Sequence, residues 1–219
     1  MDRSAVKIKF CGITNLHDAR AAIEAGAWAI GLNFWPHSPR RCDPQVAAEI
    51  AAAVKRQVEV VCIFVNPTLA ELSQTAETVG ATMLQLHGDE GPAMCAEAAR
   101  RTGCKVIKAA RVRSRADIQA LSPFHTDYHL LDGHTPGVPG GTGGTFAWEL
   151  AREHRGTVPM ILSGGLSDTN VVEAITVVRP FAVDVASGVE RAPGQKDVAK
   201  LERFAAAVRT ASSLTVAAR

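Results

Sequence analysis

Eight short apolar segments alternate with eight longer helical segments along the chain, and this alternation constrains the fold more than any other feature. The short segments are rich in β-branched residues and nearly continuous in apolarity, which is typical of parallel strands covered on both faces. Each parallel strand needs a helical crossover back to the same end of the sheet, so the pattern predicts a parallel α/β fold. The expected strands comprise residues 6–11, 29–34, 58–65, 83–87, 105–112, 128–132, 158–162 and 182–187.

The number of units favours a closed sheet. The chain has 219 residues, and 219 divided by eight is about 27, close to the length of one compact strand–loop–helix–loop unit. An open doubly wound sheet is an alternative, but eight even units favour a single-domain (β/α)8 TIM barrel over residues 1–219. The one stretch rich in Gly and Pro, residues 133–144, falls between the sixth strand and sixth helix and is therefore a loop. The Ala- and Ser-rich residues 211–219 are expected to fray.

Two of the expected helical segments carry residues that are typical of helix starts or of buried helix faces. Thr68 and Glu71 have the spacing of a capping box, in which each side chain bonds the other residue's backbone N–H. Val46, Ile50 and Val54 recur at helical spacing, which predicts that they share one buried face.

Composition excludes several classes of protein. With 24 basic and 22 acidic residues, the formal charge of +2 gives no reason to expect a nucleic acid or membrane partner. The first ten residues lack an apolar signal core, and no apolar run approaches the length of a membrane span. Five cysteines without a CxxC pair argue against a disulfide scaffold and against zinc. We therefore expect a reduced, soluble, cytoplasmic protein without a metal site.

Two glycine-containing loops predict a phosphate site. In a (β/α)8 barrel, ligands bind at the end that carries the carboxyl ends of the strands, called the mouth below. Gly164 and Gly165 follow the seventh strand, and Ser187 and Gly188 follow the eighth. Glycines let backbone N–H groups approach an anion, and a helix N-terminus adds a favourable dipole. Each loop alone could be an ordinary tight turn, but together they occupy the recurrent phosphate position of this fold.

Two reactive side chains end strands that are not neighbours in an eight-stranded barrel. Cys11 ends the first strand, and Asp132 ends the sixth. A free cysteine is commonly a buried apolar residue, but near a phosphate site its thiolate is stabilised, which makes Cys11 a candidate base or nucleophile. Asp132 is either a turn residue bonded to its own loop or a partly desolvated carboxyl suited to general acid catalysis. We expect both to flank a ligand held across the mouth.

Three further side chains are candidates for ligand contact. Arg40, in the loop after the second strand, can reach over the mouth, where its guanidinium fork suits a substrate carboxylate. Arg41 is the better candidate for a solvated loop arginine. Gln85 and His87 alternate to the same side of the fourth strand, and His87 is either a pocket residue or a satisfied core histidine. The remaining histidines lack zinc-ligand spacing.

The motifs occur in a familiar order. The following motifs occur in this order along the chain: KFCGIT, FWPHSPRR, QLHGDE, LLD followed by GGTGGTFAW, ILSGGL and VDVASGVE. In this order they resemble phosphoribosylanthranilate isomerase of tryptophan biosynthesis, and the resemblance covers about residues 6–208. It implies an Amadori rearrangement of N-(5-phosphoribosyl)anthranilate to 1-(2-carboxyphenylamino)-1-deoxyribulose 5-phosphate, without cofactor or metal.

The resemblance also assigns roles to residues. It implies that Cys11 is the general base and Asp132 the general acid, while Arg40 binds the anthranilate carboxylate. Asp184 is expected to touch a sugar hydroxyl. The expected phosphate ligands are Gly164, Gly165, Ser187 and Gly188, and Gln85 and His87 fall on pocket positions of the family.

Three positions depart from the family pattern. Phe10 stands where a smaller aliphatic residue usually precedes the cysteine, Ala147 replaces an aspartate, and Ala186 replaces a small hydroxyl residue. The alternatives are a catalytically inactive phosphosugar-binding subunit and another phosphosugar isomerase of the same fold. An epimerase would need a His/Asp metal set, and the histidine-pathway isomerase carries an aspartate where this chain has Cys11. Monomer and homodimer both stay open.

Overall fold

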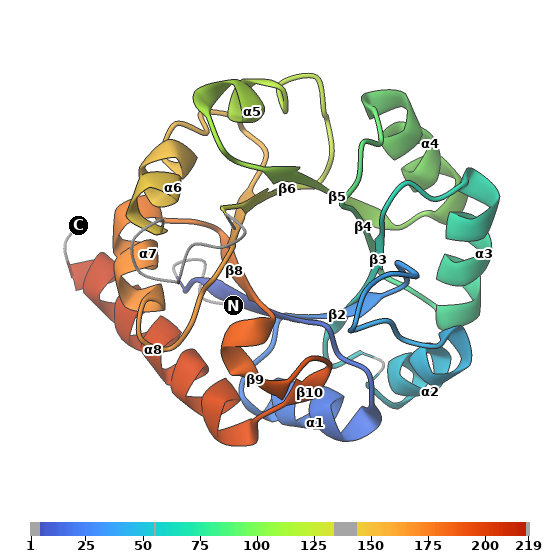
Figure 1. The fold of residues 1–219 in the computed structure, drawn as a ribbon, viewed down its shortest axis with the longest axis horizontal. Helices are drawn as coiled ribbons and strands as arrows, with labels where there is room; N and C mark the ends of the chain where they lie inside the picture. The colour runs from blue at the N-terminus through green and yellow to red at the C-terminus, as the bar shows by residue number, and fades with distance from the viewer. Residues whose placement is uncertain (1–4, 55, 134–143, 218–219) are drawn as a thin grey trace.

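The computed structural model is a closed barrel of eight parallel strands surrounded by helices (Figure 1). It describes residues 5–54, 56–133 and 144–217, except for the side chains of residues 144–147 and 215–217. The strands pair in chain order from β1 to β8, and β1 pairs with β8 to close the barrel. The prediction of a single-domain (β/α)8 barrel is therefore confirmed.

The expected strands all form, and each begins and ends within two residues of its predicted bounds. They are β1 (Lys7–Cys11), β2 (Ala29–Asn33), β3 (Glu59–Phe64), β4 (Met83–Leu86), β5 (Lys105–Arg111), β6 (Tyr128–Asp132), β7 (Met160–Ser163) and β8 (Ala182–Val185). The helices between and after them are α1 (Leu16–Glu24), α2 (Pro44–Val54), α3 (Leu69–Val79), α4 (Pro92–Thr102), α5 (Arg115–Gln119), α6 (Gly144–Ala151), α7 (Val171–Val178) and α8 (Val198–Ala217).

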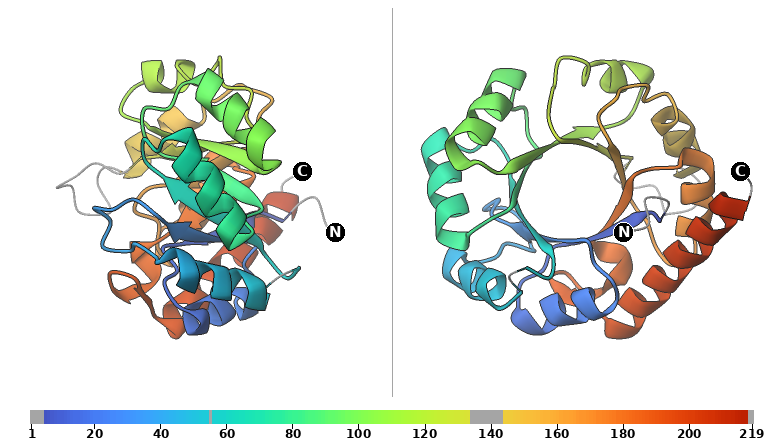
Figure 2. Two further views of the ribbon diagram at one scale, coloured as in Figure 1. Left: turned by 90° about the vertical axis from the view of Figure 1, so that its right-hand side faces the viewer. Right: turned by 180° about the vertical axis from the view of Figure 1, so that it is seen from behind.

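One short insertion was not predicted. Between β8 and α8 the chain forms a 3-10 turn, η1 (Ser187–Val189), and then an antiparallel hairpin of β9 (Glu190–Ala192) and β10 (Gln195–Lys196). Ser187 and Gly188 thus open a 3-10 turn rather than an α-helix. In the side view of Figure 2, this orange-red hairpin lies at the same face as the blue loop after β2, and the red end of α8 lies at the other face.

Local helix signals are largely confirmed. Thr68 and Glu71 form the expected capping box at the start of α3. In α2, Ile50 and Val54 are buried as predicted, but Val46 is 37% exposed. The buried stripe runs instead through Ala47 and Ala51, because packing against the barrel selects the side of α2 one position further along.

The end of α8 includes the Ala- and Ser-rich stretch after Thr210. The helix extends to Ala217. Ala211 is fully buried, and the Ser212 hydroxyl accepts a hydrogen bond from the backbone N–H of Val6 at 3.2 Å. Tertiary contacts with the first strand segment therefore hold this Ala- and Ser-rich stretch in helical form.

Period-two alternation divides every barrel strand into two faces. Outward side chains pack beneath the helices, whereas inward ones fill the barrel. The apolar interior consists of Ala29, Val61, Ile63, Met83, Ile107, Ala109, Leu130, Ile161 and Ala182. Polar side chains that point inward therefore lie above or below this apolar layer.

Two histidines form a buried pair on the outside of β6. The Nδ1 atom of His129 lies 2.9 Å from Nε2 of His154, and its Nε2 lies 3.0 Å from the carbonyl oxygen of Phe124. A carbonyl only accepts, so Nε2 of His129 carries a proton and Nδ1 accepts from His154. Burial lowers the pKa of both rings below the ordinary value. Burial therefore favours the neutral form of both imidazoles.

We expect this pair to make stability depend on pH. Because the folded pKa values lie below the unfolded ones, the unfolded chain binds more protons, and stability falls as pH drops below about 7. Urea unfolding at pH 7.5, 6.5 and 5.5 should show a smaller loss in the double variant His129→Leu/His154→Leu than in the parent chain. The exposed His37 provides the control, since His37→Gln should leave the loss unchanged. An equal loss in the double variant would contradict the assignment.

Candidate active site

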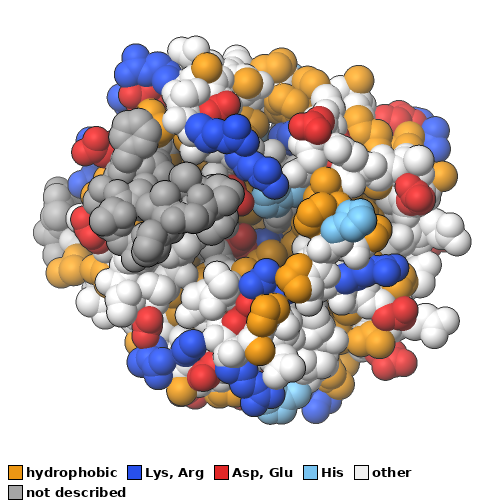
Figure 3. Space-filling view, in the orientation of Figure 1, with side chains coloured by type: hydrophobic (Ala, Val, Ile, Leu, Met, Phe, Trp, Pro, Cys, Tyr) orange, Lys and Arg blue, Asp and Glu red, His pale blue; other side chains and the backbone are white. Residues whose placement is uncertain are grey.

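The site residues predicted from strands converge at the mouth of the barrel. Cys11 and Asp132 are the last residues of β1 and β6, and Gln85, His87 and Asp184 also occupy inward-pointing positions. Figure 3 shows a hollow near the centre of this face, with basic, acidic and histidine side chains around it. Barrel closure thus brings together residues that are far apart in the chain.

Cys11 is half-buried between β2 and a buried lysine. A side chain at Gly31, its partner in β2, would place a Cβ 3.3 Å from the Cys11 sulfur, so glycine leaves space for it. Burial raises the pKa of Cys11, and the cation of Lys9 acts against that rise. Lys9 stands two positions before Cys11 and therefore lies on the same inward side of β1.

Lys9 and Asp184 form an ion pair inside the barrel. Their Nζ and Oδ1 atoms are 2.6 Å apart, and Lys9 has no exposed surface. The other carboxylate oxygen of Asp184 accepts a hydrogen bond from the hydroxyl of Ser163 at 3.1 Å. Burial opposes the charge on Lys9, but Asp184 and Cys11 outweigh it and raise the pKa of Lys9. Asp184, predicted to touch a sugar hydroxyl, is therefore also the counter-ion of Lys9.

Arg40 lies over the β1 turn and is held by a carboxylate. Its Nε and Nη2 atoms fork onto Glu190, with the shortest contact at 2.7 Å. A Cβ at Gly12 would lie 2.5 Å from Cδ of Arg40, so glycine is required under this side chain. Burial opposes ionisation of Glu190, yet Arg40 and Lys196 hold the pKa of Glu190 below its ordinary value.

Lys196 joins the hairpin to the two strands that close the barrel. Its fully buried ammonium donates to the carbonyl of Cys11 at 2.6 Å, to that of Ala186 at 3.2 Å, and to Glu190 at 3.0 Å. Burial lowers the pKa of Lys196, against the attraction of Glu190. The β9–β10 hairpin thereby anchors both the Cys11 backbone and the Arg40 side chain.

His87 links the fourth strand to Asp132. Nε2 of Gln85 lies 2.9 Å from Nδ1 of His87. An amide nitrogen only donates, so Nδ1 accepts, and Nε2 is the ring nitrogen that carries the hydrogen. That Nε2 lies 3.5 Å from Oδ2 of Asp132. The interpretation of His87 as a pocket residue agrees with this position, because its ring faces the carboxylate at the end of β6.

A buried ion pair orders the loop that carries His87. The carboxylate of Glu90 accepts hydrogen bonds from the backbone N–H groups of Asn66 at 2.7 Å and Gly88 at 2.9 Å. The ammonium of Lys108 donates to both Glu90 and the Gly88 carbonyl. Two neighbouring mouth loops are therefore tied to one carboxylate beside His87.

The loops after β7 and β8 meet in a small pocket. It has a volume of about 440 Å³ and is lined by Gly165, Leu166, Ser167, Thr169, Asn170, Ser187 and Gly188. Gly164 and Gly165 have φ values of 100° and 65°, a region that favours glycine. A Cβ at Gly188 would collide with the Leu166 carbonyl oxygen. The predicted phosphate loops thus come together at the N-terminus of α7.

Comparisons with known proteins identify the family of this chain. A family described as "N-(5'phosphoribosyl)anthranilate (PRA) isomerase" matches residues 8–207. The chain belongs to this family. An N-(5'-phosphoribosyl)anthranilate isomerase of Pseudomonas putida is 47% identical over 210 residues, covering 95% of this chain and 100% of that protein. The resemblance drawn from the motifs is therefore confirmed.

Two solved structures of phosphoribosyl anthranilate isomerase superpose closely. That of Thermotoga maritima has a TM-score of 0.85 and 41% identity, covering 94% of this chain and 99% of the other. A second, in complex with reduced 1-(o-carboxyphenylamino)-1-deoxyribulose 5-phosphate, has a TM-score of 0.81 and 37% identity, with the same coverage. This chain therefore shares the whole barrel with the isomerases.

Two of the three departures from the isomerase pattern, Phe10 and Ala186, lie at positions whose contacts the structure describes. Phe10 is fully buried on the outward face of β1, with its ring edge against Phe204 of α8. Ala186 contributes its carbonyl to Lys196. The side chain of Ala147, and most of the Gly- and Pro-rich loop after Asp132, lie outside the described residues.

Sequence reasoning missed Lys9, Glu190 and Lys196. Lys9 had a local signal, because it stands two residues before Cys11 and so points to the same side of the strand. Glu190 and Lys196 had none, since they belong to the unpredicted hairpin. Among the described residues, no group of three or more His, Cys, Asp or Glu side chains could hold a metal ion. The helices that the structure describes also include none long and apolar enough to cross a membrane.

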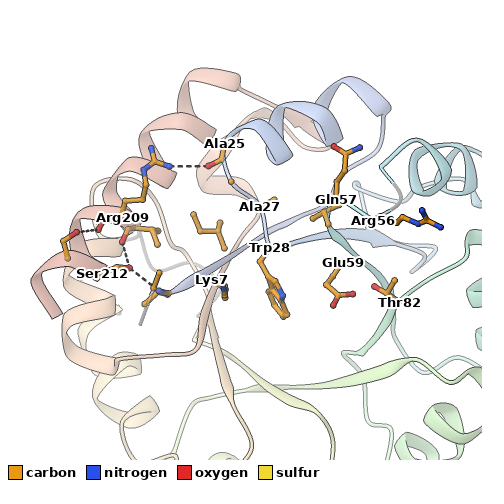
Figure 4. Close-up of a pocket in the computed structure, with 17 residues that line it drawn as sticks. Lys7, Ala25, Ala27, Trp28, Arg56, Gln57, Glu59, Thr82, Arg209 and Ser212 are labelled. Carbon is orange, nitrogen blue, oxygen red and sulfur yellow. Dashed lines mark hydrogen bonds between the residues drawn. The ribbon is translucent and has the colours of Figure 1, made fainter. Parts of the chain in front are cut away.

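A larger cavity of about 1320 Å³ opens at the opposite end of the barrel. Figure 4 shows Lys7, Trp28, Glu59 and Arg209 around it, at or near the amino ends of the first strands and on α8. Its described lining contains none of the predicted site residues. In a (β/α)8 barrel this end contributes to stability rather than catalysis, so we place the active site at the mouth.

The buried ammonium of Lys196 should be essential for stability. Lys196→Met leaves Glu190 with one cation fewer and two backbone carbonyls without their donor, so urea unfolding should show a loss of about 3–5 kcal/mol. Lys200→Met removes one ammonium that donates to the Glu190 carbonyl at 2.7 Å from a partly buried position. This control should cost at most about 1.5 kcal/mol. Equal losses would refute a special contribution of Lys196.

Proposed function

We propose that this protein catalyses the Amadori rearrangement of N-(5'-phosphoribosyl)anthranilate to 1-(2-carboxyphenylamino)-1-deoxyribulose 5-phosphate in tryptophan biosynthesis. The observation that carries the proposal is the placement of Cys11 and Asp132 at the mouth, on β1 and β6, in a chain of the isomerase family. One substrate that needs an acid and a base on different sides fits this arrangement. We further propose that the enzyme works in the cytoplasm, with a small molecule and not nucleic acid as its partner.

Asp132 is the proposed general acid. Its protonated carboxyl donates a proton to the furanose ring oxygen, the bond between that oxygen and C1′ breaks, and the nitrogen lone pair forms a Schiff base with C1′. The N–H of His87 on the side facing Asp132 supports the carboxylate formed in this step. The half-exposed position of Asp132 lets the substrate reach it.

Cys11 is the proposed general base. Its thiolate takes the proton from C2′, an S–H bond forms, and the C–H electron pair becomes the C1′–C2′ double bond of the enolamine. Tautomerisation then moves one proton from O2′ to C1′ and produces the ketone. No cofactor is needed, because the step gains and loses no electrons overall.

The two charged ends of the substrate have separate proposed sites. The phosphate fits the pocket lined by Gly165, Ser187 and Gly188, with Gly164 next to it in the chain, where backbone N–H groups and the start of α7 favour an anion. The anthranilate carboxylate is assigned to Arg40, which Glu190 holds in place over the mouth. Asp184 is assigned to a sugar hydroxyl between them.

Turnover of phosphoribosylanthranilate, followed by the change in anthranilate fluorescence, tests the proposal directly. Cys11→Ala and Asp132→Asn should each lower kcat by about 100-fold or more, since acid–base groups typically contribute that much. Cys104→Ala is the matched control. Cys104 is half-buried away from the mouth, where its thiol donates a hydrogen bond to the Ala81 carbonyl. This variant should keep the parent rate. Absence of turnover by the folded parent chain would refute the activity, and a near-normal rate in either variant would refute that residue's role.

A negative charge in the phosphate pocket should weaken substrate binding. Thr169 is exposed at the pocket rim, and Thr169→Glu places a carboxylate where the phosphate is proposed to bind. Like-charge repulsion should raise KM by about tenfold or more and leave kcat nearly unchanged. Inorganic phosphate should also inhibit this variant less than the parent. Thr176→Glu, at an exposed position of α7, should change neither value; an unchanged KM in Thr169→Glu would place the phosphate elsewhere.

A further inference from the structure

The ion pair of Lys9 and Asp184 is not required for packing the barrel. Neighbouring interior positions are filled by Ala, Val, Ile, Met and Leu side chains, and Lys9 is fully buried beside them. A buried ion pair recovers its desolvation cost only with excellent geometry, and well-packed apolar residues usually serve stability equally well. A charged residue at this position therefore calls for a role other than packing.

The role follows from the position of Lys9 relative to Cys11. A cysteine acts as a base only as its thiolate, which burial disfavours. Three cations face Cys11, namely Lys9 from β1, Lys196 from β10 and Arg40 from the loop after β2. Lys196 and Arg40 share the carboxylate of Glu190, whose charge offsets theirs. Lys9 stands two positions before Cys11 on the same inward side of β1, and of the three cations it opposes the rise in the pKa of Cys11 most strongly.

We propose that Lys9 is a positioning residue: on the same inward side of β1 as Cys11, its ammonium, held by Asp184, favours the thiolate form of Cys11 against the effect of burial. Ser163 fixes the other oxygen of Asp184, so the carboxylate cannot turn away from Lys9. Lys9 stays protonated when Cys11 takes the proton from C2′, and no proton passes through it. This inference rests on the proposed function only in taking Cys11 as the base.

The two charges of the pair act on Cys11 in opposite directions. The cation of Lys9 lowers the pKa of Cys11, and the carboxylate of Asp184 raises it. Removing the lysine should therefore make the thiolate rarer at a given pH, whereas removing the aspartate should make it more abundant. General damage to the barrel would not produce effects of opposite sign.

Alkylation of Cys11 by iodoacetamide across pH, followed by peptide mass spectrometry, measures the thiolate directly. At fixed pH, Lys9→Met should react about tenfold or more slowly than the parent, because a unit charge close to the sulfur is lost. Asp184→Asn should react faster. Lys7→Met is the matched control on the same strand and side, and it should react at the parent rate.

Lys9→Met leaves the buried carboxylate of Asp184 without its partner. A second variant serves as the test if this unpaired charge prevents Lys9→Met from folding. Lys9→Met/Asp184→Asn carries neither buried charge, and it should react about tenfold or more slowly than Asp184→Asn. In the isomerase assay, the acidic limb of the kcat/KM profile should move to higher pH in Lys9→Met and to lower pH in Asp184→Asn. Parent-like alkylation of Lys9→Met would overturn the proposal, and so would a double variant that reacts as fast as Asp184→Asn. Slower alkylation in all three variants would also overturn it. Alkylation needs no turnover, so a failure of the proposed activity would leave this result separate.

Discussion

The pairing of β1 with β8 is the contact on which the rest of the structure depends. It closes the barrel and sets Lys9 beside Asp184, 175 residues further along the chain. The same closure brings the β9–β10 hairpin against the Cys11 carbonyl through Lys196. Without it, Cys11 would end an edge strand, and the polar groups now buried around its sulfur would be exposed to water.

Alternation along the strands then determines whether an inward side chain lies in the apolar interior or at the mouth of the barrel. Leu130 and Asp132 lie on one side of β6, with the leucine in the apolar interior and the carboxylate at the mouth. On β1 and β8, however, Lys9 and Asp184 carry charge deeper into the barrel. Asp184 is linked to β7 through Ser163, which pairs in register with Asp132. The proposed base and acid thus lie at opposite ends of one chain of neighbouring polar residues.

Sequence reasoning was most successful where chemistry is local. The strand ends at Cys11 and Asp132, the shared side of Gln85 and His87, and the capping box of Thr68 and Glu71 depend on spacing along one segment. Sequence reasoning was less successful where contacts between separate segments determine which residues are buried or paired. The buried side of α2 excludes Val46, and α8 stays helical to its end because Val6 bonds to Ser212. The fork of Arg40 onto Glu190 joins residues 150 positions apart.

The sequence by itself determined the strand–helix alternation, the barrel that follows from it, the motif order of the isomerase family, and which strands end in reactive residues. These properties depend on period-two and helical spacing and on local turn chemistry. Only the tertiary structure decided which charges are paired, because ion pairs such as Lys9 with Asp184 and Lys196 with Glu190 arise where separate segments meet. Their burial also decided the ionisation of Cys11, since the energy of a buried charge depends on its three-dimensional surroundings.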